Sequence, residues 1–391
     1  RGGPPPDAAE TLRRLSASSQ VPPVSGAEDR IAAHEWTHLR NVLAIRLDSM
    51  GDVLMTGPAL AAIRATSPHA RITVLTSHAG ALAVPHLGVA DETLIYSAPW
   101  VAGNVHEEMG EDLGRSEAAL IASLAALRFD AAIVFTVCTQ SPLPAAFMAR
   151  LAGIPRRLAY CRENPYGLLT EWAAETDEIG DGMRHEVQRH LDLVSHVGFR
   201  TDDDRLRFQG EARHFEEARL LLQAGNPRGL PYFVVHPGAS APSRRYPAES
   251  FGDAAEEIAR RTGRLAVFTG SPDEQPLVDR ARARMSSPSI SLAGRLSVAV
   301  LGALIAEADL LVSNNTGPAH IAAAVDTPVV DLYALTNPQH TPWRVRSVVL
   351  SHRVPCRYCL KSVCPEGHND CLRAIPPSSV VQAALSVPLT V

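Results

Sequence analysis

The stretch NVLAIRLDSMGDVLMTGPALAAIRAT, residues 41–66, decides the fold of this 391-residue chain. NVLAIRL is a short apolar run rich in β-forming residues, DSMGD is typical of a turn, and the residues after it have apolar side chains at helical spacing. Strand, loop and helix in this order form a βα unit. Further strands at 71–77, 92–96 and 130–135, separated by helical stretches such as 116–128, predict a parallel, doubly wound α/β sheet.

The same pattern restarts after a polar stretch at residues 201–214. Strands at PYFVVHPG, RLAVFTG, DLLVSNN and PVVDLYA alternate with helical segments, which predicts a second Rossmann-like domain. We therefore expect a flexible N-terminal extension at 1–38, a first Rossmann-like domain at 39–204, a second at 205–376, and a C-terminal helix at 377–391. Two such domains imply a shared cleft.

Composition narrows the class of protein. With 46% hydrophobic and 20% charged residues the chain is typical of soluble globular proteins, and it has no apolar run long enough to predict a transmembrane segment. Its N-terminus lacks the apolar region of a signal peptide, so we expect a cytoplasmic monomer, at most peripheral to the inner face of a membrane. Residues 1–200 hold 17 basic and 23 acidic residues, which argues against nucleic acid as a ligand.

Three loops at the ends of predicted strands carry unusual residues: DSMGD at 48–52, HPGASAPSRRYP at 236–247 and SNNTGPAH at 313–320. Open α/β sheets bind ligands at the carboxyl ends of their strands. Since two sheets that share a cleft turn these ends toward each other, we expect the chemistry of the protein at these three loops.

The loop SNNTGPAH places the hydroxyl of Thr316 and the unencumbered backbone of Gly317 just before a helix. Helix N-termini offer unpaired N–H groups and the positive end of the dipole to phosphate, so a diphosphate would suit this loop. An ordinary N-cap, in which Asn315 or Thr316 satisfies the helix and Gly317 eases the turn, explains the same residues.

The loop HPGASAPSRRYP exposes backbone at small residues and offers a hydroxyl at Ser240 and two cations at Arg244 and Arg245. This composition suits the charge of a leaving diphosphate. A solvated arginine pair on a proline-rich loop would have the same composition.

Asp52 begins the helix after the first strand. A carboxylate in the first turn of a helix is stabilised by the helix dipole, and this alone explains its position. Alternatively Asp52 is a general base that lies within about 3 Å of an acceptor hydroxyl, with Gly51 leaving room for a bulky acceptor. Asp48 is the rival base and could instead bind the acceptor.

In their order and spacing, IRLDSMGDVLMTGPAL, HPGASAPSRRYP and SNNTGPAHIAAAVDTPVVDLYALTNP resemble glycosyltransferase family 9, the lipopolysaccharide heptosyltransferases. The resemblance extends over about residues 41–381 and includes FTGSPDE, LAGIPRR and HEVQRHLDLV. It implies a GT-B fold and ADP-L-glycero-β-D-manno-heptose as the donor. It also implies transfer with inversion at the anomeric carbon that requires no metal ion or other cofactor.

The resemblance also implies roles for single residues. It makes Asp52 the base and places Arg244 beside the donor phosphates, where the family usually has lysine. Further donor-binding positions are the small or hydroxyl residues of the second loop, the acidic residue that holds the ribose and the apolar residue that flanks adenine. In this chain these are Ala239 and Ser240, Glu274 and Leu296, respectively.

The last motif departs from the family at one position. The family pattern is D-T-G followed by H, which corresponds here to Asn315, Thr316, Gly317 and His320. An amide at Asn315 can still form a hydrogen bond with a sugar hydroxyl but lacks the negative charge of aspartate. The identity of the donor sugar therefore stays open.

CRYCLKSVCPEGHNDC, residues 356–371, is rich in possible metal ligands: Cys356, Cys359, Cys364, Cys371 and His368. C-x2-C with two further thiols could bind a structural zinc ion. Its spacing matches no common zinc finger, so a disulfide or a group of free thiols that braces the C-terminal region is the alternative. Cys138 and Cys161 are isolated in the sequence and are expected to be buried thiols.

The acceptor and the exact activity stay open. A lipid A core is strongly anionic whereas the first domain is acidic, so a soluble glycoside is an alternative to a glycan or glycolipid acceptor. Arg156, Arg157 and Arg162 form the one basic cluster of this half and could contact an anionic group, although a solvated loop would contain them as well. Rival functions are transfer of a related nucleotide-activated sugar to a secondary metabolite, a GT-B-like nucleotide-sugar epimerase and a non-catalytic binding protein.

Overall fold

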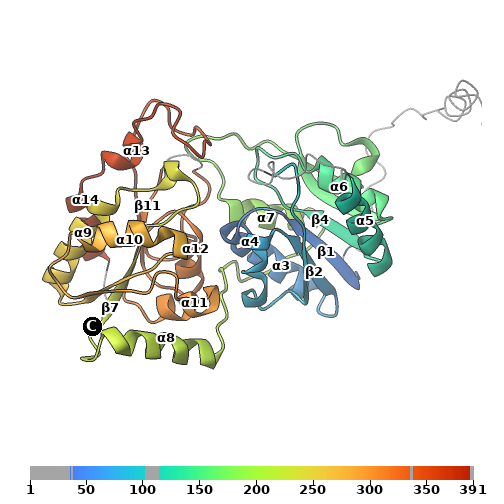
Figure 1. Ribbon diagram of the computed structural model, residues 1–391. Coiled ribbons are helices and arrows are strands. Elements are labelled where there is room, and N and C mark those ends of the chain that lie inside the picture. Colours follow the sequence, from blue (N-terminus) through green and yellow to red (C-terminus); the bar gives the residue numbers. More distant parts are fainter. Residues whose placement is uncertain (1–35, 37, 102–113, 335–337, 388–391) are drawn as a thin grey trace, which may run out of the picture.

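The computed structural model describes residues 36, 38–101, 114–334 and 338–387, which form two lobes (Figure 1). Most of the predicted extension, residues 1–35, lies outside this part of the chain. Trp36 falls within the predicted extension, yet it is fully buried and packs edge-on against Phe199 with ring centroids 6.3 Å apart. The core of the first domain therefore includes a residue that precedes the expected boundary at 39.

The first sheet has six parallel strands in the order β3-β2-β1-β4-β5-β6. Their bounds are β1 Asn41–Arg46, β2 Arg71–Thr76, β3 Glu92–Ile95, β4 Ala131–Val134, β5 Arg156–Cys161 and β6 Glu171–Ala174. This is the Rossmann strand order, so the prediction of a doubly wound sheet is confirmed. Strands β5 and β6 were not predicted.

The second sheet repeats this order as β12-β11-β10-β7-β8-β9, again all parallel. Its strands are β7 Tyr232–His236, β8 Leu265–Phe268, β9 Ser289–Ser291, β10 Leu311–Asn314, β11 Val329–Leu332 and β12 Ser347–Leu350. The prediction of two Rossmann-like domains is therefore confirmed.

Helices cover both faces of each sheet. In the first lobe these are α3 Met50–Thr66, α4 His78–Ala81, α5 Arg115–Leu127, α6 Leu143–Leu151 and α7 Glu186–Ser195. In the second they are α8 Ala212–Gly225, α9 Ala248–Thr262, α10 Gln275–Arg282, α11 Val298–Ala306, α12 Gly317–Ala324, α13 Asp370–Arg373 and α14 Pro377–Ser386. Short 3-10 helices lie at Val84–His86, Tyr166–Leu168, Pro242–Arg244 and Pro272–Glu274. Within the described residues, no helix has the length and apolar character needed to span a bilayer.

Strand β1 shows why the parallel sheet needs helices on both faces. Its side chains alternate between two apolar clusters: Val42 and Ala44 belong to one, Leu43 and Ile45 to the other. All four are almost completely buried, as is expected for a strand covered on both sides. The near-continuous apolar run that predicted this strand is thus explained by burial of both faces.

The two lobes contact each other through helices that begin at strand ends. Helix α3 packs against α7 and against α12 of the second domain. Strand order reverses between β1 and β4 in the first sheet and between β7 and β10 in the second. These reversals are the points at which open α/β sheets bind ligands, and the three unusual loops follow β1, β7 and β10.

Candidate functional site

The N-termini of α3 and α12 meet at the contact between the domains. A Cβ atom added to Gly51 would lie 2.6 Å from Cδ2 of His320, and one added to Gly317 would overlap Cε of Met50. Both glycines therefore allow close approach of the two helices. The expectation that Gly51 leaves room for an acceptor is wrong in this conformation, because the imidazole of His320 fills that space.

Asp52 is part of the first turn of α3 and also of an ion pair. Its Oδ2 accepts hydrogen bonds from the backbone N–H of Ser49 at 3.0 Å and from the Ser49 hydroxyl at 2.6 Å. Its Oδ1 lies 3.1 Å from Nη2 of Arg46. Burial opposes ionisation of Asp52, but Arg46, His340 and Ser49 outweigh it and lower the pKa to about 2. The carboxylate is thus ionised and held in place by two neighbours.

Arg46 ends strand β1 and is shared by three carboxylates. Its Nε lies 3.0 Å from Oδ2 of Asp48, its Nη1 lies 2.9 Å from Oε1 of Glu186, and its Nη2 contacts Asp52. The side chain is 1% exposed. Asp48 also accepts a hydrogen bond from Nε2 of Gln140 at 2.7 Å, and burial raises the pKa of Asp48 despite Arg46. The two candidate bases therefore differ: Asp52 is a stable anion, whereas Asp48 is more easily protonated.

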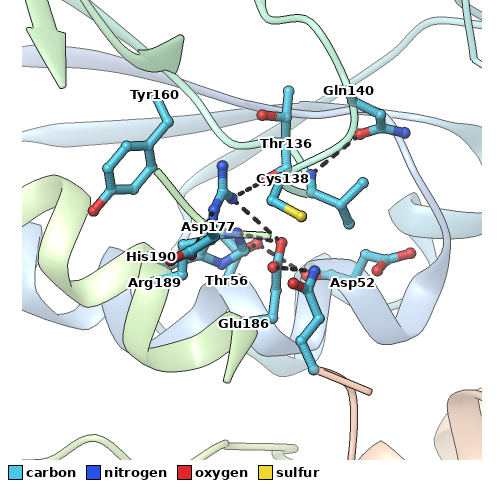
Figure 2. A network of polar contacts seen from close by, with 12 residues as sticks. Asp52, Thr56, Thr136, Cys138, Gln140, Tyr160, Asp177, Glu186, Arg189 and His190 are labelled. Atoms are coloured by element: carbon cyan, nitrogen blue, oxygen red, sulfur yellow. Dashed lines mark hydrogen bonds and ion pairs between the residues drawn. The ribbon is translucent and has the colours of Figure 1, made fainter. Parts of the chain in front are cut away.

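Glu186, at the start of α7, extends this cluster toward both domains (Figure 2). It is completely buried and contacts Nε2 of His190 at 3.0 Å and Nη1 of Arg189 at 3.7 Å. Gln339 of the second domain donates to its Oε2 at 2.6 Å. Burial opposes ionisation, but His190, Arg46 and Arg189 hold the pKa of Glu186 well below its ordinary value. Buried charges need such partners, so this cluster fixes Arg46 and through it Asp52.

On the donor side, the N-terminus of α12 is not capped by a side chain. Thr316 is the N-cap residue, but its hydroxyl makes no capping hydrogen bond and lies 3.4 Å from the carbonyl oxygen of Asn314. The amide of Asn315 points elsewhere, to Asp331 and to the carbonyl oxygen of His340. Capping of the helix by the side chain of Asn315 or Thr316 is therefore wrong. Pro318 has no N–H and the N–H of Ala319 donates to the carbonyl oxygen of Thr316, so the N–H of Gly317 is the donor that the first turn leaves open among the described residues.

His320 lies one turn into α12 and has an unusual environment. It is 4% exposed, and among the described residues its Nδ1 has no hydrogen-bond partner. Burial and the nearby charge of His340 lower the pKa of His320 to about 3. The ring is therefore neutral at neutral pH. Its Cδ2 and Nε2 face Gly51, and its Nδ1 is buried without a partner among the described residues.

The two arginines of the loop after β7 are not equivalent. Nε of Arg245 donates to the carbonyl oxygen of Ala239 at 2.7 Å and so stabilises the loop itself. Arg244 is half-buried and close enough to His320 and His340 for its charge to contribute to their lowered pKa values. Of the predicted pair, Arg244 is thus the one whose charge acts on the histidines at the contact between the domains.

The remaining donor-side residues follow the carboxyl ends of β7, β8 and β9. Ala239 is buried and Ser240 is exposed on the same loop. The carboxylate of Glu274 accepts the N–H of Ser271 at 2.8 Å and occupies the space where a Cβ of Gly238 would lie. Leu296 is half-buried and packs on the apolar core. The fold thus brings Glu274 against the loop after β7, as a shared ligand would require.

Asn315 faces a carboxylate that was not predicted as a site residue. Its Nδ2 donates to Oδ2 of Asp331, in the neighbouring strand β11, at 2.8 Å. Asp331 is fully buried, and its Oδ1 has no partner among the described residues. Burial raises the pKa of Asp331 from 3.8 to about 7, against the opposing effect of Asn315. The acidic group absent at position 315 is therefore present one strand away.

We expect Asn315→Asp to destabilise the protein more at about pH 8 than at about pH 5. Two buried carboxylates in contact cannot both ionise, and the lost hydrogen bond costs about 1 to 3 kcal/mol. Wild-type Asp331 already contributes stability that is present below pH 3.8 and lost as the pH rises through about 7. Thermal unfolding at both pH values measures the effect. The double variant Asn315→Asp/Asp331→Asn restores one amide facing one carboxylate; if it is no more stable than the single variant, this contact is not the cause.

The cysteine-rich segment contains free thiols. Cys356, Cys359, Cys364 and Cys371 line a small cavity of about 20 Å³ together with His368, and none of the four thiols is in a disulfide. Sγ of Cys356 lies 3.8 Å from Nε2 of His368. Across the described residues no group of three or more His, Cys, Asp or Glu has the geometry of a metal site, so the zinc interpretation is not supported. These four cysteines form no disulfide in the structure either, so of the two alternatives to zinc the free thiols are the one observed. Cys138 and Cys161 are buried free thiols, as predicted.

This segment instead contacts the donor loop. Ser243 is buried, its N–H donates to the carbonyl oxygen of Ser362 at 3.0 Å, and its hydroxyl donates to that of Lys361 at 2.6 Å. The segment therefore supports the short helix that carries Arg244.

The predicted basic cluster of the first domain does not form. Arg156 and Arg157 begin strand β5, so they lie at the amino ends of the strands, away from the site. Arg162 follows the carboxyl end of the same strand. Arg157 is buried, and its guanidinium donates to the carbonyl oxygens of Ile154 and Leu168. Arg162 donates to the carbonyl oxygens of Cys138 and Asp177. These three cations therefore do not converge on an anionic ligand.

Three comparisons with known proteins identify the family and the fold of the chain. The model of a family described as glycosyltransferase family 9 (heptosyltransferase) matches residues 118–369. The chain is 26% identical over 358 residues to lipopolysaccharide heptosyltransferase 2 of Escherichia coli K12. This match covers 87% of this chain and 96% of that protein. It is also 26% identical over 183 residues to lipooligosaccharide heptosyltransferase 2 of Campylobacter jejuni, but this match covers 44% of this chain and spans only 57% of that protein.

Among solved structures, the ADP-heptose lipopolysaccharide heptosyltransferase II of E. coli superposes with a TM-score of 0.68 at 22% identity, covering 88% of this chain and 98% of that one. At this identity the likeness establishes the fold, a GT-B arrangement of two Rossmann-like domains.

Proposed function

The chain belongs to glycosyltransferase family 9, the heptosyltransferases, and from this premise we propose that it transfers a heptose from ADP-L-glycero-β-D-manno-heptose to an acceptor hydroxyl. The observation that carries the proposal is the meeting of α3 and α12. One helix begins with an ionised carboxylate, Asp52, and the other with an uncapped N-terminus beside Arg244. A base and an anion-binding helix end on facing domains are what transfer from a nucleotide diphosphate donor requires.

The donor would bind the second domain. The N–H groups at Gly317 and the guanidinium of Arg244 counter the diphosphate, with Ala239 and Ser240 exposing backbone and hydroxyl beside it. Glu274 holds the ribose, and Leu296 packs on adenine. Thr316, whose hydroxyl is not engaged in capping, and His320, whose buried Nδ1 has no partner among the described residues, would contact sugar or phosphate oxygens of the bound donor. Asn315 with Asp331 faces the sugar hydroxyls.

In the reaction, the acceptor oxygen forms a bond to the anomeric carbon while the bond from that carbon to the β-phosphate oxygen breaks, which inverts the configuration. The hydroxyl proton passes to Asp52, and ADP leaves with the electron pair. A carboxylate of pKa about 2 is a weak base toward a free hydroxyl. The hydroxyl becomes strongly acidic as its oxygen bonds to carbon, so Asp52 accepts the proton late. Arg244 and the N-terminus of α12 supply the positive charge for ADP, and no metal ion takes part.

The names of the relatives suggest a lipopolysaccharide or lipooligosaccharide core as the acceptor class. The acceptor would bind the first domain beside Asp48, which keeps a glycolipid and a soluble glycoside both compatible with the site.

Acceptor-dependent release of ADP tests the proposal. Purified protein is incubated with ADP-heptose and EDTA, with and without a glycan acceptor, and ADP and glycosylated product are quantified. We expect ADP release only with acceptor, in equal amount to product, and unaffected by EDTA. ADP release without acceptor, or isomerisation of the donor sugar, would indicate a hydrolase or an epimerase instead.

A further inference from the structure

The first domain contains a cavity at the switch point of its sheet. It lies beyond the ends of β1 and β4 and has a volume of about 260 Å³. Trp100 and Phe135 contribute aromatic walls, and Asp48, Thr136, Gln140 and Ser141 contribute polar groups. Asp48 lines the cavity and shares the guanidinium of Arg46 with Asp52, so one arginine links the cavity wall to the proposed base.

In the part of the chain that the structure describes, the lining of this cavity has almost no charge. Among the described residues that line it, Asp48 alone is ionisable, and it is already paired with Arg46 and Gln140. A phosphate or carboxylate on the ligand would find a carboxylate and no cation here. Binding an anion in such a place is unfavourable, because a buried charge without a partner loses its hydration.

A second cavity of about 210 Å³ adjoins the first through Thr139, Gln140 and Ser141. Arg162 is the cation among its lining residues, and it is accompanied by Glu163 and Glu175. Arg162 already donates to two backbone carbonyl oxygens, and the two carboxylates beside it outnumber its single positive charge, so an anionic group gains little from this second cavity. Both cavities thus disfavour anionic groups.

We propose that the cavity between Trp100 and Gln140 binds the acceptor ring that carries the reacting hydroxyl, and that this ring is an uncharged sugar. This inference rests on the proposed function and specifies its acceptor. Trp100 is 36% exposed at the cavity and offers an aromatic surface to the apolar face of a sugar ring. The hydroxyls of Thr139 and Ser141 and the amide of Gln140 can pair with sugar hydroxyls without any charge. Phosphate or carboxylate groups elsewhere on a larger acceptor would stay outside the cavity.

Three acceptors that differ at one substituent test this inference: methyl α-mannopyranoside, its phosphate ester on the primary hydroxyl, and the corresponding uronic acid. Calorimetry first measures ADP-heptose binding, and then the affinity of each glycoside with ADP present. We expect the neutral glycoside to bind at least about tenfold more tightly than either anion. Failure to bind ADP-heptose would contradict the proposed function. Donor binding with equal or better affinity for an anionic glycoside, or with no affinity for the neutral one, would overturn this inference alone.

Substitutions of residues that line the cavity test whether the preference for the neutral glycoside arises there. Trp100→Ala should weaken binding of the neutral glycoside about tenfold, and Trp100→Phe should retain most of it. Thr139→Arg adds a cation where the two cavities join and should shift the preference at least about tenfold toward the uronic acid. Thr139→Gln is the matched uncharged control: it loses the same hydroxyl, so it should weaken binding of all three glycosides alike and leave their order of affinity as in wild type. An unchanged preference in Thr139→Arg would place the acceptor ring elsewhere.

Discussion

Replacing Asp52 by asparagine is expected to lower kcat for heptose transfer by about 10²- to 10⁴-fold, the usual contribution of a general base. Asparagine keeps the size of the side chain and can still accept a hydrogen bond from Arg46, but it cannot take up the proton. Affinity for ADP-heptose should change little, because Asp52 lies on the first domain while the proposed donor contacts lie on the second. Steady-state kinetics and calorimetry with ADP-heptose measure the two effects.

Asp48→Asn is the matched control, since Asp48 contacts the same arginine from four residues away. It is expected to alter acceptor affinity more than kcat. If Asp48→Asn abolishes turnover and Asp52→Asn does not, Asp48 is the base and Asp52 has only a structural role in the first turn of α3. With a pKa of about 2, Asp52 is ionised throughout the range of about pH 5 to 8, so its protonation does not limit the wild-type rate there.

Much of the fold could be predicted because local patterns decide it. The apolar run at 41–47, the turn and the helix recur as β1, the loop and α3, and the restart of the pattern after residue 214 gives the second sheet. Strand β5 was missed because its sequence, RRLAYC, begins with two arginines that resemble a solvated loop. In the structure Arg157 is buried and its guanidinium is satisfied by carbonyl oxygens, a solution that a hydropathy pattern does not reveal.

The site was predicted in part, for the same kind of reason. Motifs identified the loops around Asp52, Arg244 and Gly317, since each is contiguous in sequence. Glu186 and Gln339 were missed because tertiary structure alone brings them to the site. Glu186 contacts Arg46 across 140 residues of chain, and Gln339 contacts Glu186 across 153 residues. One signal was available: Arg46 is a charged residue at the end of an otherwise apolar, buried strand, and such a residue must have partners. That signal predicts a partner without identifying it.

Gly51 illustrates an interpretation that was reasonable but wrong. A glycine beside a candidate base suggests access for a substrate, yet here it allows His320 to approach from the second domain. Similarly, Asn315 suggested a lost negative charge, but Asp331 restores a carboxyl group at 2.8 Å. In both cases the deciding neighbour is remote in sequence or lies on the other domain.

Replacing Glu186 by alanine is expected to reduce the free energy of unfolding by about 3 to 5 kcal/mol, which would make it the most destabilising of the substitutions considered. Glu186 is completely buried, and its loss removes the carboxylate that contacts Nη1 of Arg46 and the amide of Gln339, so the buried guanidinium loses one of its three negative partners. Urea unfolding at neutral pH measures the difference. Glu257→Ala is the matched control, because Glu257 also pairs with two arginines, Arg260 and Arg261, but on the exposed surface of α9. The free energy of unfolding of the Glu257→Ala variant should be close to that of the wild type.

The pH dependence separates loss of charge at Glu186 from loss of packing. Because the pKa of Glu186 is held well below its ordinary value of 4.5 in the folded protein, its contribution is present above that value and is lost as the pH falls. Wild type should therefore lose stability faster on acidification than Glu186→Gln, which has nearly the same shape and no charge to neutralise. If both proteins follow the same pH profile, burial of the side chain stabilises the fold and its charge does not. Parallel loss of kcat in Glu186→Gln would show that Arg46 transmits this charge to Asp52, since Glu186 itself does not touch the proposed base.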